Sequence, residues 1–261
     1  MATRETDPSR SSSVERAFDL MDRVAAAGSG GIALGELAAE VPTAKSTTHR
    51  YVATLLEIGA LRRDGGGRLR LGLKLVELAG AQLDSDNLRA VAEPVLHDLV
   101  AQTGETVHLG VLAEDHVVYV AKVESPQSVR LVSRIGAQAP LHCSAMGKSI
   151  LARFDERALA DALGLPRERR TSHTIVALKP LRAELARVRA AGYAIDDEEN
   201  ELGVRCIGTA VGGWAGAAPA AISVSGPAAR MTHERCAQVA PAMLSAAAEI
   251  ERRLGRSSPR G

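Results

Sequence analysis

The sequence lacks the features that mark secreted, membrane-embedded or disulfide-bonded chains. Its 261 residues include three cysteines, which lie far apart and form no Cys-x-x-Cys pair: Cys143, Cys206 and Cys236. We therefore expect neither a disulfide framework nor a structural zinc site, and the pattern fits a reducing cytosol. The chain also has no apolar run long enough to cross a bilayer and no signal-peptide core after Met1, so we expect it to be cytoplasmic.

Neither sign of charge is in excess overall, yet the charge is unevenly distributed. The formal net charge is +1, and hydrophobic residues make up 46% of the chain, which is enough for a packed core. Residues 44–74 carry seven Lys or Arg against two acidic residues, a net charge of +5, whereas residues 1–43 carry −3. A basic block of this kind indicates a localised contact with a polyanion, although a solvated surface gives the same pattern.

Residues 13–72 follow the order of a winged helix-turn-helix domain. Apolar residues at helical spacing alternate with glycine and proline breaks, and a glycine run separates two short alternating stretches. The expected elements are helices at about 13–24, 34–41 and 44–58 and strands at 61–63 and 68–71. Residues 73–86 predict a helix that leads out of the second strand, and we interpret it as a linker. We expect the polar tails, 1–12 and 255–261, to be disordered.

Residues 87–254 predict a larger α+β domain, in which helices cover an antiparallel sheet. Helices are expected at about 88–102, 147–153, 156–163, 181–191 and 232–254, and strands at about 107–112, 117–123, 129–135, 206–211 and 220–224. The first two strands are expected to form one hairpin. The last two are expected to form another, through a glycine-rich turn.

The third predicted helix has the composition of a helix that reads DNA. Its first turns are small, polar and basic, while Val52, Leu55 and Leu56 form an apolar side that would anchor it. Hydroxyl groups and a helix N-terminus suit phosphate oxygens, and Arg50 can bind a guanine or a phosphate with two hydrogen bonds. The candidate DNA contacts are Lys45, Ser46, Thr47, Thr48, His49 and Arg50 on this helix, with Arg68 and Arg70 on the wing. A solvent-facing helix in an ordinary bundle would show the same spacing.

Long motifs in both segments resemble one family of regulators. They are SSVERAFDLMDRVAAAGSGGIALGELAAEVPTAKSTTHRYVATLLEIGALRRDGGG in the first segment, and TGETVHLGVL, SVRLVSRIGAQAPLHCSAMGKSILA, GYAIDDEENELGVRCIGTAV and AAISVSGPAAR in the second. In this order they resemble the IclR family of bacterial transcriptional regulators over residues 13–254. The resemblance implies a repressor of a catabolic operon, a GAF-like effector domain, and a dimer or tetramer. Since one small head reads few base pairs, we expect a near-palindromic double-stranded operator.

Two positions depart from the family's pattern. The approach to the third helix reads Val41-Pro42-Thr43-Ala44 in place of Gly-Leu-Pro or Gly-Leu-Ser. The second helix follows Ala33 rather than a capping Ser or Thr, and Gly35 within it costs roughly 1 kcal/mol of helix propensity. These departures bear on the expected target sequence more than on the expected fold.

Three segments of the second domain carry groups suited to a small ligand. Residues 142–147 predict a strand-to-helix turn whose backbone N–H groups suit an anion. Asp196 and Cys206 add an acid and a thiol, and alternation places the hydroxyls of Ser223 and Ser225 on one side of a strand. Each has a plainer interpretation as well: a buried cysteine is most often a small hydrophobe, and the acidic run 196–199 a solvated loop.

The resemblance implies that these segments form one effector site for a small organic acid. The implied site contains Leu131, Ala145, Met146, Gly147, Asp196, Val204, Cys206, Ser223 and Ser225, with Ala139 near its apolar wall. An ionised Asp196 would repel a ligand carboxylate. Either backbone N–H groups at 145–147 hold the carboxylate while Asp196 accepts hydrogen bonds from ligand hydroxyls, or Asp196 is protonated. Both arrangements predict an acid with a hydroxyl or a hydratable carbonyl. Similarity to the family's ketodeoxygluconate-repressor branch indicates a sugar acid or short keto acid.

A hydrolase fused to the helix-turn-helix is the main alternative. Its nucleophile would be Cys206 or Ser144, with His142 as the base and Asp196 as the orienting acid. The sequence has no Gly-x-Ser-x-Gly elbow, phosphate-binding loop or His-Glu-x-x-His motif, so we expect no enzyme activity and no cofactor. A metal site formed by His142, Asp196 and Cys206 is a weaker alternative. An architectural DNA-binding protein without a ligand would leave the large second domain unexplained.

Overall fold

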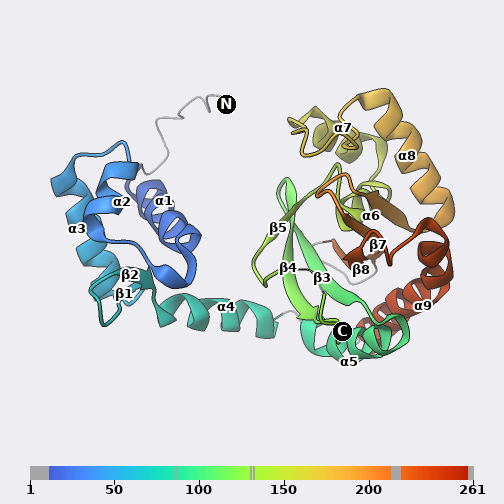
Figure 1. The fold of residues 1–261 in the computed structure, drawn as a ribbon, viewed down its shortest axis with the longest axis horizontal. Coiled ribbons are helices and arrows are strands. Elements are labelled where there is room, and N and C mark those ends of the chain that lie inside the picture. Colours follow the sequence, from blue (N-terminus) through green and yellow to red (C-terminus); the bar gives the residue numbers. More distant parts are fainter. Residues whose placement is uncertain (1–11, 86, 130, 132, 213–218, 258–261) are drawn as a thin grey trace. The chain divides into compact units, whose positions relative to one another are not determined.

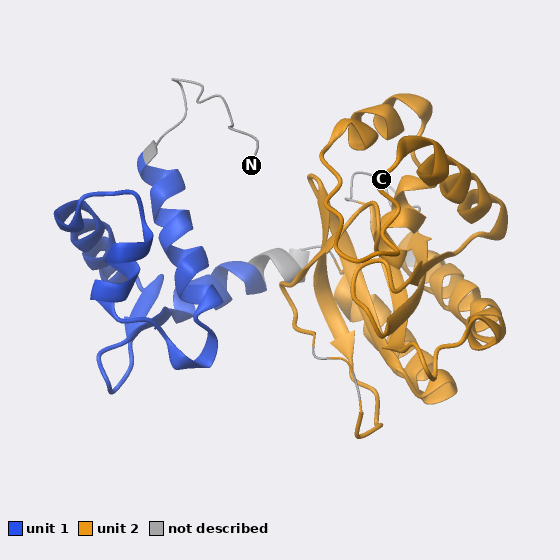
Figure 2. Cartoon of the chain, turned by 45° about the horizontal axis from the view of Figure 1, so that its top comes forward, with its two compact units in different colours: residues 1–82 blue, residues 83–261 orange. Residues whose placement is uncertain are grey.

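The computed structural model describes residues 12–85, 87–129, 131, 133–212 and 219–257. The chain divides into two compact units, residues 1–82 and residues 83–261 (Figures 1 and 2). The first unit contains one cluster of buried hydrophobic residues and the second contains two. Within the described residues, no helix combines the length and the apolar character that a membrane span requires.

The first unit is a three-helix head with a two-stranded wing. It contains α1 (Ser12–Ala26), a short 3-10 turn (Gly28–Gly30), α2 (Leu34–Glu40), α3 (Lys45–Glu57), β1 (Leu61–Arg63) and β2 (Leu69–Leu71). The two strands are antiparallel, with Leu61 opposite Leu71. Its core contains Leu20, Met21, Val24, Ile32, Leu37, Val52, Leu55, Ala60, Leu61 and Leu69. The predicted winged helix-turn-helix order is confirmed.

Helix α4 (Leu73–Ser85) follows the wing directly, and the division between the two units falls near its C-terminal end, at Gln82. Three of its apolar side chains are exposed: Leu73, Val76 and Leu78. Most of the stability of a helix in a protein comes from packing of its apolar side. The exposed apolar side chains of α4 are therefore available for contact with a partner.

The second unit is built on an antiparallel sheet whose described strands lie in the order β5-β4-β3-β8-β7-β6. Its elements are α5 (Leu88–Thr103), β3 (Thr106–Ala113), β4 (His116–Val123), β5 (Gln138–Pro140), α6 (Ala145–Leu151), α7 (Glu156–Gly164), α8 (Leu178–Ala191), β6 (Ala194–Asp197), β7 (Val204–Val211), β8 (Ala220–Pro227) and α9 (His233–Ser257). The predicted combination of an antiparallel sheet with flanking helices is confirmed.

Alternation along the strands divides the core of this unit between the two faces of the sheet. Ile222 and Val224 of β8 belong to a cluster with α5 and α9, whereas Ala221 belongs to a cluster with α6, α7 and α8. Successive side chains of a strand point to opposite faces, so Ser223 and Ser225 share the α6 face with Ala221. Figure 1 shows the two groups of helices around the sheet.

Several predicted elements differ from the structure. None of the described residues of 129–135 lies in the strand expected there: Val129 and Ile135 are exposed, and the edge of the sheet is formed by β5 instead. The acidic run 196–199 was considered as a solvated loop, but its first two residues belong to β6, which ends at Asp197, and only Glu198 and Glu199 follow the strand. The last helix extends to Ser257, so the tail expected from residue 255 begins within a helix. The glycine-rich turn at 213–218 and the tails 1–11 and 258–261 lie outside the described residues.

Candidate functional site

The exposed side of α3 carries four of the predicted DNA contacts. Lys45, Ser46, His49 and Arg50 are exposed, and Thr47 is half-buried. Their spacing places these four side chains on one side of the helix, because residues three to four positions apart are neighbours on a helical surface. The opposite side of α3 packs into the core of the head through its apolar residues. The arrangement offers a polar, cationic surface on a rigid support.

Thr48 differs from the prediction, because its side chain is completely buried. Its Oγ1 lies 2.8 Å from Oγ1 of Thr43 and 3.5 Å from the carbonyl oxygen of Ala44. Residue 48 is one helical turn before the buried Val52 and faces the same way. Its hydroxyl therefore stabilises the turn between α2 and α3 and is not available to a phosphate or a base.

The two predicted wing contacts are engaged within the head. Arg68 donates hydrogen bonds to the carbonyl oxygens of Gly30 and Gly31 and to Glu36 Oε2, all at 3.0–3.1 Å. Arg70 Nε donates to Asp64 Oδ2 at 2.8 Å, and this bond holds the pKa of Asp64 below its usual value. These arginines set the shape of the wing.

Two other arginines of the wing are exposed, and sequence reasoning left them out of the interface. Arg62 and Arg63 both belong to β1 and follow the buried Leu61. Arg63 Nη1 reaches the carbonyl oxygen of Gly67 at 3.0 Å, across the turn of the wing. The basic pattern of residues 44–74 contained this signal, yet it does not show which of the arginines are exposed in the folded head.

A cavity of about 300 Å³ lies in the second unit and contains most of the predicted effector site. Its lining residues are His108, Tyr119, Leu131, Ser133, Ser144, Ala145, Met146, Asp196, Asn200, Glu201, Val204, Cys206, Ser223 and Ser225. Eight of the nine predicted residues are among them, and Gly147 is the exception. Segments far apart in the sequence thus meet in one place, at a volume typical of small-ligand pockets.

The register of the sheet explains how these side chains come together. Asp196 lies opposite Cys206, Cys206 opposite Ser225, and His108 opposite Ser223. Residues directly opposite on neighbouring strands project to the same face and approach closely. The Oγ atoms of Ser223 and Ser225 are 3.4 Å apart. The sheet therefore presents a polar patch on the face that α6 covers.

Helix α6 approaches this patch because a glycine lies beneath it. A Cβ atom at Gly208 would be 2.8 Å from the carbonyl carbon of Ala145 and 3.0 Å from the nitrogen of Met146. Such contacts are too short for any side chain. Gly208 therefore brings the first residues of α6 against the sheet at the cavity.

Gly147 has a packing role that differs from its predicted one. A Cβ atom there would be 2.4 Å from the Cα of Leu141, so the glycine lets α6 pack on the preceding turn. Its N–H donates to Oγ of Ser144 at 3.0 Å, and that hydroxyl donates to the carbonyl oxygen of Pro140 at 2.6 Å. The N–H of Gly147 is thus already used to cap the helix.

Asp196 is the acidic group of the cavity, and it is almost completely buried. Its Oδ1 accepts the N–H groups of Glu199 at 2.9 Å and Asn200 at 3.2 Å. Burial raises the pKa of Asp196 to about 7, even though these two hydrogen bonds favour the carboxylate. Both protonation states are therefore accessible near neutral pH.

A buried lysine lies next to this acid. Lys148 of α6 is fully buried, and its Nζ contacts Glu199, donates to the carbonyl oxygen of Ile195 at 2.6 Å and reaches Glu184 Oε1 at 3.3 Å. Buried charges persist only when they are paired and hydrogen-bonded. This ion cluster fixes the segment that carries Asp196 against α6.

His108 forms another wall of the cavity and was missed by sequence reasoning, as were Tyr119, Ser133, Asn200 and Glu201. Its Nε2 lies 2.7 Å from Oγ of Ser133, and its ring stacks on that of Tyr119 at a centroid distance of 4.7 Å. Burial and the nearby charge of Lys122 lower the pKa of His108 to about 4. The ring is therefore uncharged at neutral pH. A histidine between the core residues Val107 and Leu109 was the available signal.

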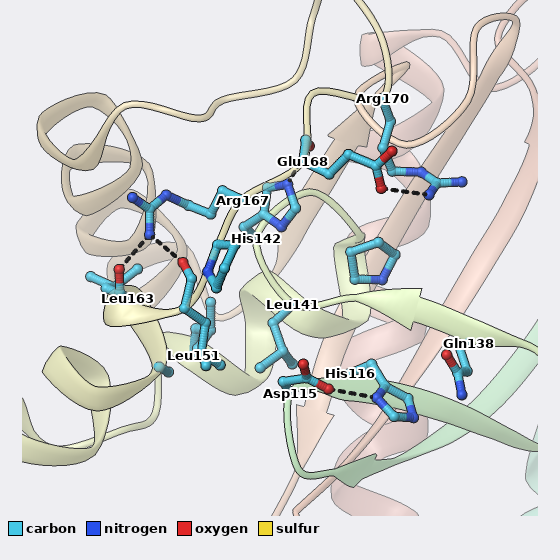
Figure 3. A pocket seen from close by; sticks show the side chains of 14 residues that line it. Asp115, His116, Gln138, Leu141, His142, Leu151, Leu163, Arg167, Glu168 and Arg170 are labelled. Carbon is cyan, nitrogen blue, oxygen red and sulfur yellow. Dashed lines mark hydrogen bonds and ion pairs between the residues drawn. The ribbon is translucent and has the colours of Figure 1, made fainter. Parts of the chain in front are cut away.

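A second cavity, of about 360 Å³, lies between the β3–β4 turn, α7 and the loop after α7 (Figure 3). Arg167 on its wall donates to the carbonyl oxygens of Leu163, Leu165 and Val176. His142 Nε2 pairs with the carbonyl oxygen of Glu168 at 3.0 Å. Arg167 and His142 are already hydrogen-bonded to carbonyl oxygens of the chain. This cavity therefore has fewer polar groups available to a ligand than the first one has.

The geometry gives no support to the hydrolase alternative. His142 lines the second cavity, whereas Ser144, Asp196 and Cys206 line the first. Burial, followed by the charge of Asp196, raises the pKa of the Cys206 thiol, which disfavours the nucleophilic thiolate. Within the described residues, no three His, Cys, Asp or Glu side chains are grouped so that they could hold a metal ion.

Comparison with known families agrees with this architecture. The model of the IclR helix-turn-helix domain matches residues 13–65, and the model described as bacterial transcriptional regulator IclR C-terminal matches residues 80–252. The chain belongs to the IclR family. It is accordingly a transcriptional regulator with a DNA-binding head and an effector domain, and not an enzyme.

Individual members of the IclR family match along most of the chain. The HTH-type transcriptional regulator KdgR of Escherichia coli is 34% identical over 259 residues, which cover 98% of each protein. The transcriptional repressor IclR of the same organism is 33% identical over 91% of this chain and 88% of its own length. An IclR homologue from Microbacterium hydrocarbonoxydans, crystallised with 4-hydroxybenzoate, matches with a TM-score of 0.79 at 25% identity, over 94% of this chain and 98% of that one.

Proposed function

We propose that this chain is a cytoplasmic repressor of a catabolic operon, and that a small organic acid in the cavity of the second unit controls its binding to DNA. The observation that carries the proposal is the shared lining of Asp196, Cys206, Ser223 and Ser225 in one cavity of about 300 Å³. We assign residues 13–72 to the DNA-binding domain, 73–86 to the linker and 87–254 to the effector-binding domain. The similarity to the E. coli repressor IclR supports the sign of regulation.

The ligand is a small acid with a hydroxyl group or a hydratable carbonyl. The cavity volume of about 300 Å³ lies at the lower end of the range of roughly 300–1,000 Å³ for ligand pockets, which favours a small ligand. Ser223 and Ser225 can donate to a carboxylate, and so can Asp196 when it is protonated. A sugar acid or a short keto acid fits, and the hydroxybenzoate in the Microbacterium homologue is likewise an acid with a hydroxyl.

DNA binding is assigned to the exposed side of α3 and to the exposed arginines of the wing. Lys45, Ser46, His49 and Arg50 form the reading surface, with Thr47 at its margin, while Arg62 and Arg63 supply phosphate contacts. Arg68 and Arg70 keep the wing in shape for that contact. Double-stranded DNA is the partner, since the major groove admits one helix.

Self-association to a dimer or tetramer is assigned to apolar side chains that the single chain leaves exposed. Val14 and Phe18 of α1 and Leu73, Val76 and Leu78 of α4 are 55–73% exposed. A second copy of the chain is the occupant that suits a near-palindromic operator, since two-fold protein symmetry matches a two-fold DNA site.

Calorimetry and gel-shift titration together test the proposed function. The purified chain is titrated with glycerate, lactate, pyruvate, 4-hydroxybenzoate and glucose, and each acid that binds is then added to the chain on DNA fragments that it selects from a random pool. We expect at least one acid to bind and to weaken the DNA complex, and Ser223→Ala to reduce its affinity. Binding of glucose alone, or acid binding that Ser223→Ala and Asp196→Ala leave unchanged, would contradict the assignment.

A further inference from the structure

Two side chains of the effector cavity carry buried polar atoms without a hydrogen-bond partner in the described part of the chain. They are Nδ1 of His108 and Oδ1 of Asn200, and both residues line the cavity. A buried polar atom that lacks a partner costs free energy, so folded proteins keep few of them. Their presence at a ligand cavity indicates that the ligand, and not the protein, supplies their hydrogen-bond partners.

His108 is held rigidly in position to make such a bond. Its side chain is 2% exposed, its Nε2 pairs with Ser133, and its ring stacks on Tyr119. Because the ring is uncharged and Nε2 is engaged, Nδ1 is left as one directional donor or acceptor. Nδ1 is therefore suited to a neutral polar group and offers no positive charge to a carboxylate.

Asn200 complements His108 from a different segment. It follows Glu199 in the β6–β7 connection, and its backbone N–H donates to Asp196 Oδ1 at 3.2 Å. The unpartnered atom of its side chain is an amide oxygen, which can only accept a hydrogen bond. A carboxylate has no proton to donate to it at neutral pH, whereas a hydroxyl has one donor and two acceptor positions.

We propose that His108 and Asn200 determine the specificity of the effector site by binding a hydroxyl group of the ligand. The carboxylate of the same ligand is left to Ser223, Ser225 and Asp196. This inference rests on the proposed function, since it names the ligand class of that site. It predicts that the chain selects hydroxy acids against acids of the same carbon chain that lack the hydroxyl, because the latter leave both buried atoms unpaired.

Calorimetry on the full chain with matched pairs of acids tests the inference. The pairs are glycerate or lactate against propionate, which share three carbons and one carboxylate. We expect wild type to bind glycerate or lactate at least roughly tenfold more tightly than propionate, as befits one or two buried hydrogen bonds. His108→Phe keeps an aromatic ring beside Tyr119 but removes both ring nitrogens. It should lose about tenfold in affinity for the hydroxy acid and less than about threefold for propionate.

Matched variants separate this role from a structural one. His116→Phe makes the same substitution at the second cavity and should leave both affinities unchanged. Ser223→Ala should weaken the hydroxy acid and propionate alike. Asn200→Ala removes a half-buried side chain while keeping its backbone bond to Asp196, so it provides the selective loss even where His108→Phe does not fold.

The outcomes distinguish this inference from the function it rests on. Equal affinity of wild type for glycerate, lactate and propionate overturns the specificity role and leaves the acid sensor intact. So does an equal loss for both classes of acid in His108→Phe or Asn200→Ala. Failure of wild type to bind any organic acid overturns the proposed function itself, and the specificity role falls with it.

Discussion

Nη2 of Arg68 in the wing lies 3.0 Å from Oε2 of Glu36 in the first turn of α2. The same carboxylate oxygen accepts the N–H of Ala33 at 2.9 Å, at the position where α2 has no hydroxyl cap. The guanidinium also binds the carbonyl oxygens of Gly30 and Gly31. One arginine thus connects the wing, the glycine turn and the start of α2, and Glu36 takes over part of the missing cap.

Replacing this arginine should affect stability, whereas replacing an exposed one should affect DNA binding. Arg68→Ala leaves carbonyl groups without their donor, so we expect the free energy of unfolding of the head to fall by about 1 kcal/mol. Arg62→Ala should leave the melting temperature unchanged and lower the salt slope of DNA binding by about 1. Thermal unfolding and gel shifts at several salt concentrations measure both. A lower salt slope in Arg68→Ala at an unchanged melting temperature would assign it to the interface instead.

On α3, replacing Arg50 should likewise affect DNA binding, whereas replacing Thr48 should affect stability. Arg50→Ala should weaken operator binding by about 1–3 kcal/mol and relax sequence preference, because the exposed guanidinium can reach base edges. Thr48→Val removes the buried hydroxyl opposite Thr43 and should destabilise the head by about 1 kcal/mol while keeping the preference among DNA sites. Competition gel shifts with altered sites provide the measurement. Relaxed preference in Thr48→Val would show that the buried position reads DNA after all.

Effector affinity should depend on pH through Asp196. An anion bound beside Asp196 favours the protonated form of this residue. Before the ligand binds, the pKa of the Asp196 side chain is about 7. Affinity for a carboxylate ligand should therefore be constant below about pH 7 and fall by up to about tenfold per pH unit above it. Calorimetry from pH 5 to 9 measures this dependence. Asp196→Asn serves as the control and should flatten it, whereas a profile that rises above pH 7 would refute the coupling.

Replacing the buried Lys148 alone should lower the free energy of unfolding more than replacing it together with its partner Glu199. Lys148→Met leaves Glu199 in a buried position without its cation, and breaking a buried ion pair costs about 3–5 kcal/mol of stability. The double variant Lys148→Met, Glu199→Gln should recover part of that loss. Denaturant unfolding of the wild type, both single variants and the double variant measures the coupling. A double variant no more stable than Lys148→Met would argue against the pair as the source of the effect.

Oligomerisation should depend on the exposed side of α4. Val76, 65% exposed, is a candidate interface residue, and Val76→Glu would place a charge in an apolar contact. We expect it to shift the sedimentation coefficient toward that of the single chain and to weaken operator binding. Leu178→Glu, at an exposed leucine of α8, is the matched control and should change neither. Identical sedimentation of Val76→Glu and wild type would place the interface elsewhere.

Local patterns predicted most of the elements but not the edges of the sheet. The helices of the head followed from apolar residues at helical spacing and from glycine and proline breaks. Strand β5 was missed because Gln138 and Pro140 disfavour a strand interior, although proline is tolerated at a sheet edge. The stretch 129–135 has strand-like composition, but none of its described residues pairs with a neighbouring strand. Composition alone does not reveal which segment obtains a partner.

The residues of the candidate site likewise divide into those that the sequence predicts and those that it does not. Cys206, Ser223 and Ser225 were predicted from family motifs and strand alternation, both of which can be recognised within one segment. His108 and Asn200 required the pairing of β3 with β8 and the fold of the β6–β7 connection, which depend on contacts between distant segments. Thr48 is the opposite case: it was predicted as a DNA contact from the polar first turns of α3, but tertiary packing buries it.

The pairing of β3 with β8 also orders events during synthesis. Thr106 on β3 lies opposite Ser225 on β8, so the centre of the sheet and its effector cavity cannot form until nearly the whole chain has been translated. The core of the head lies within the first 69 residues. At synthesis rates of about 5–20 residues per second, the head can fold roughly 8–30 s before the sheet is complete. A growing chain could therefore meet DNA before it is able to sense its acid.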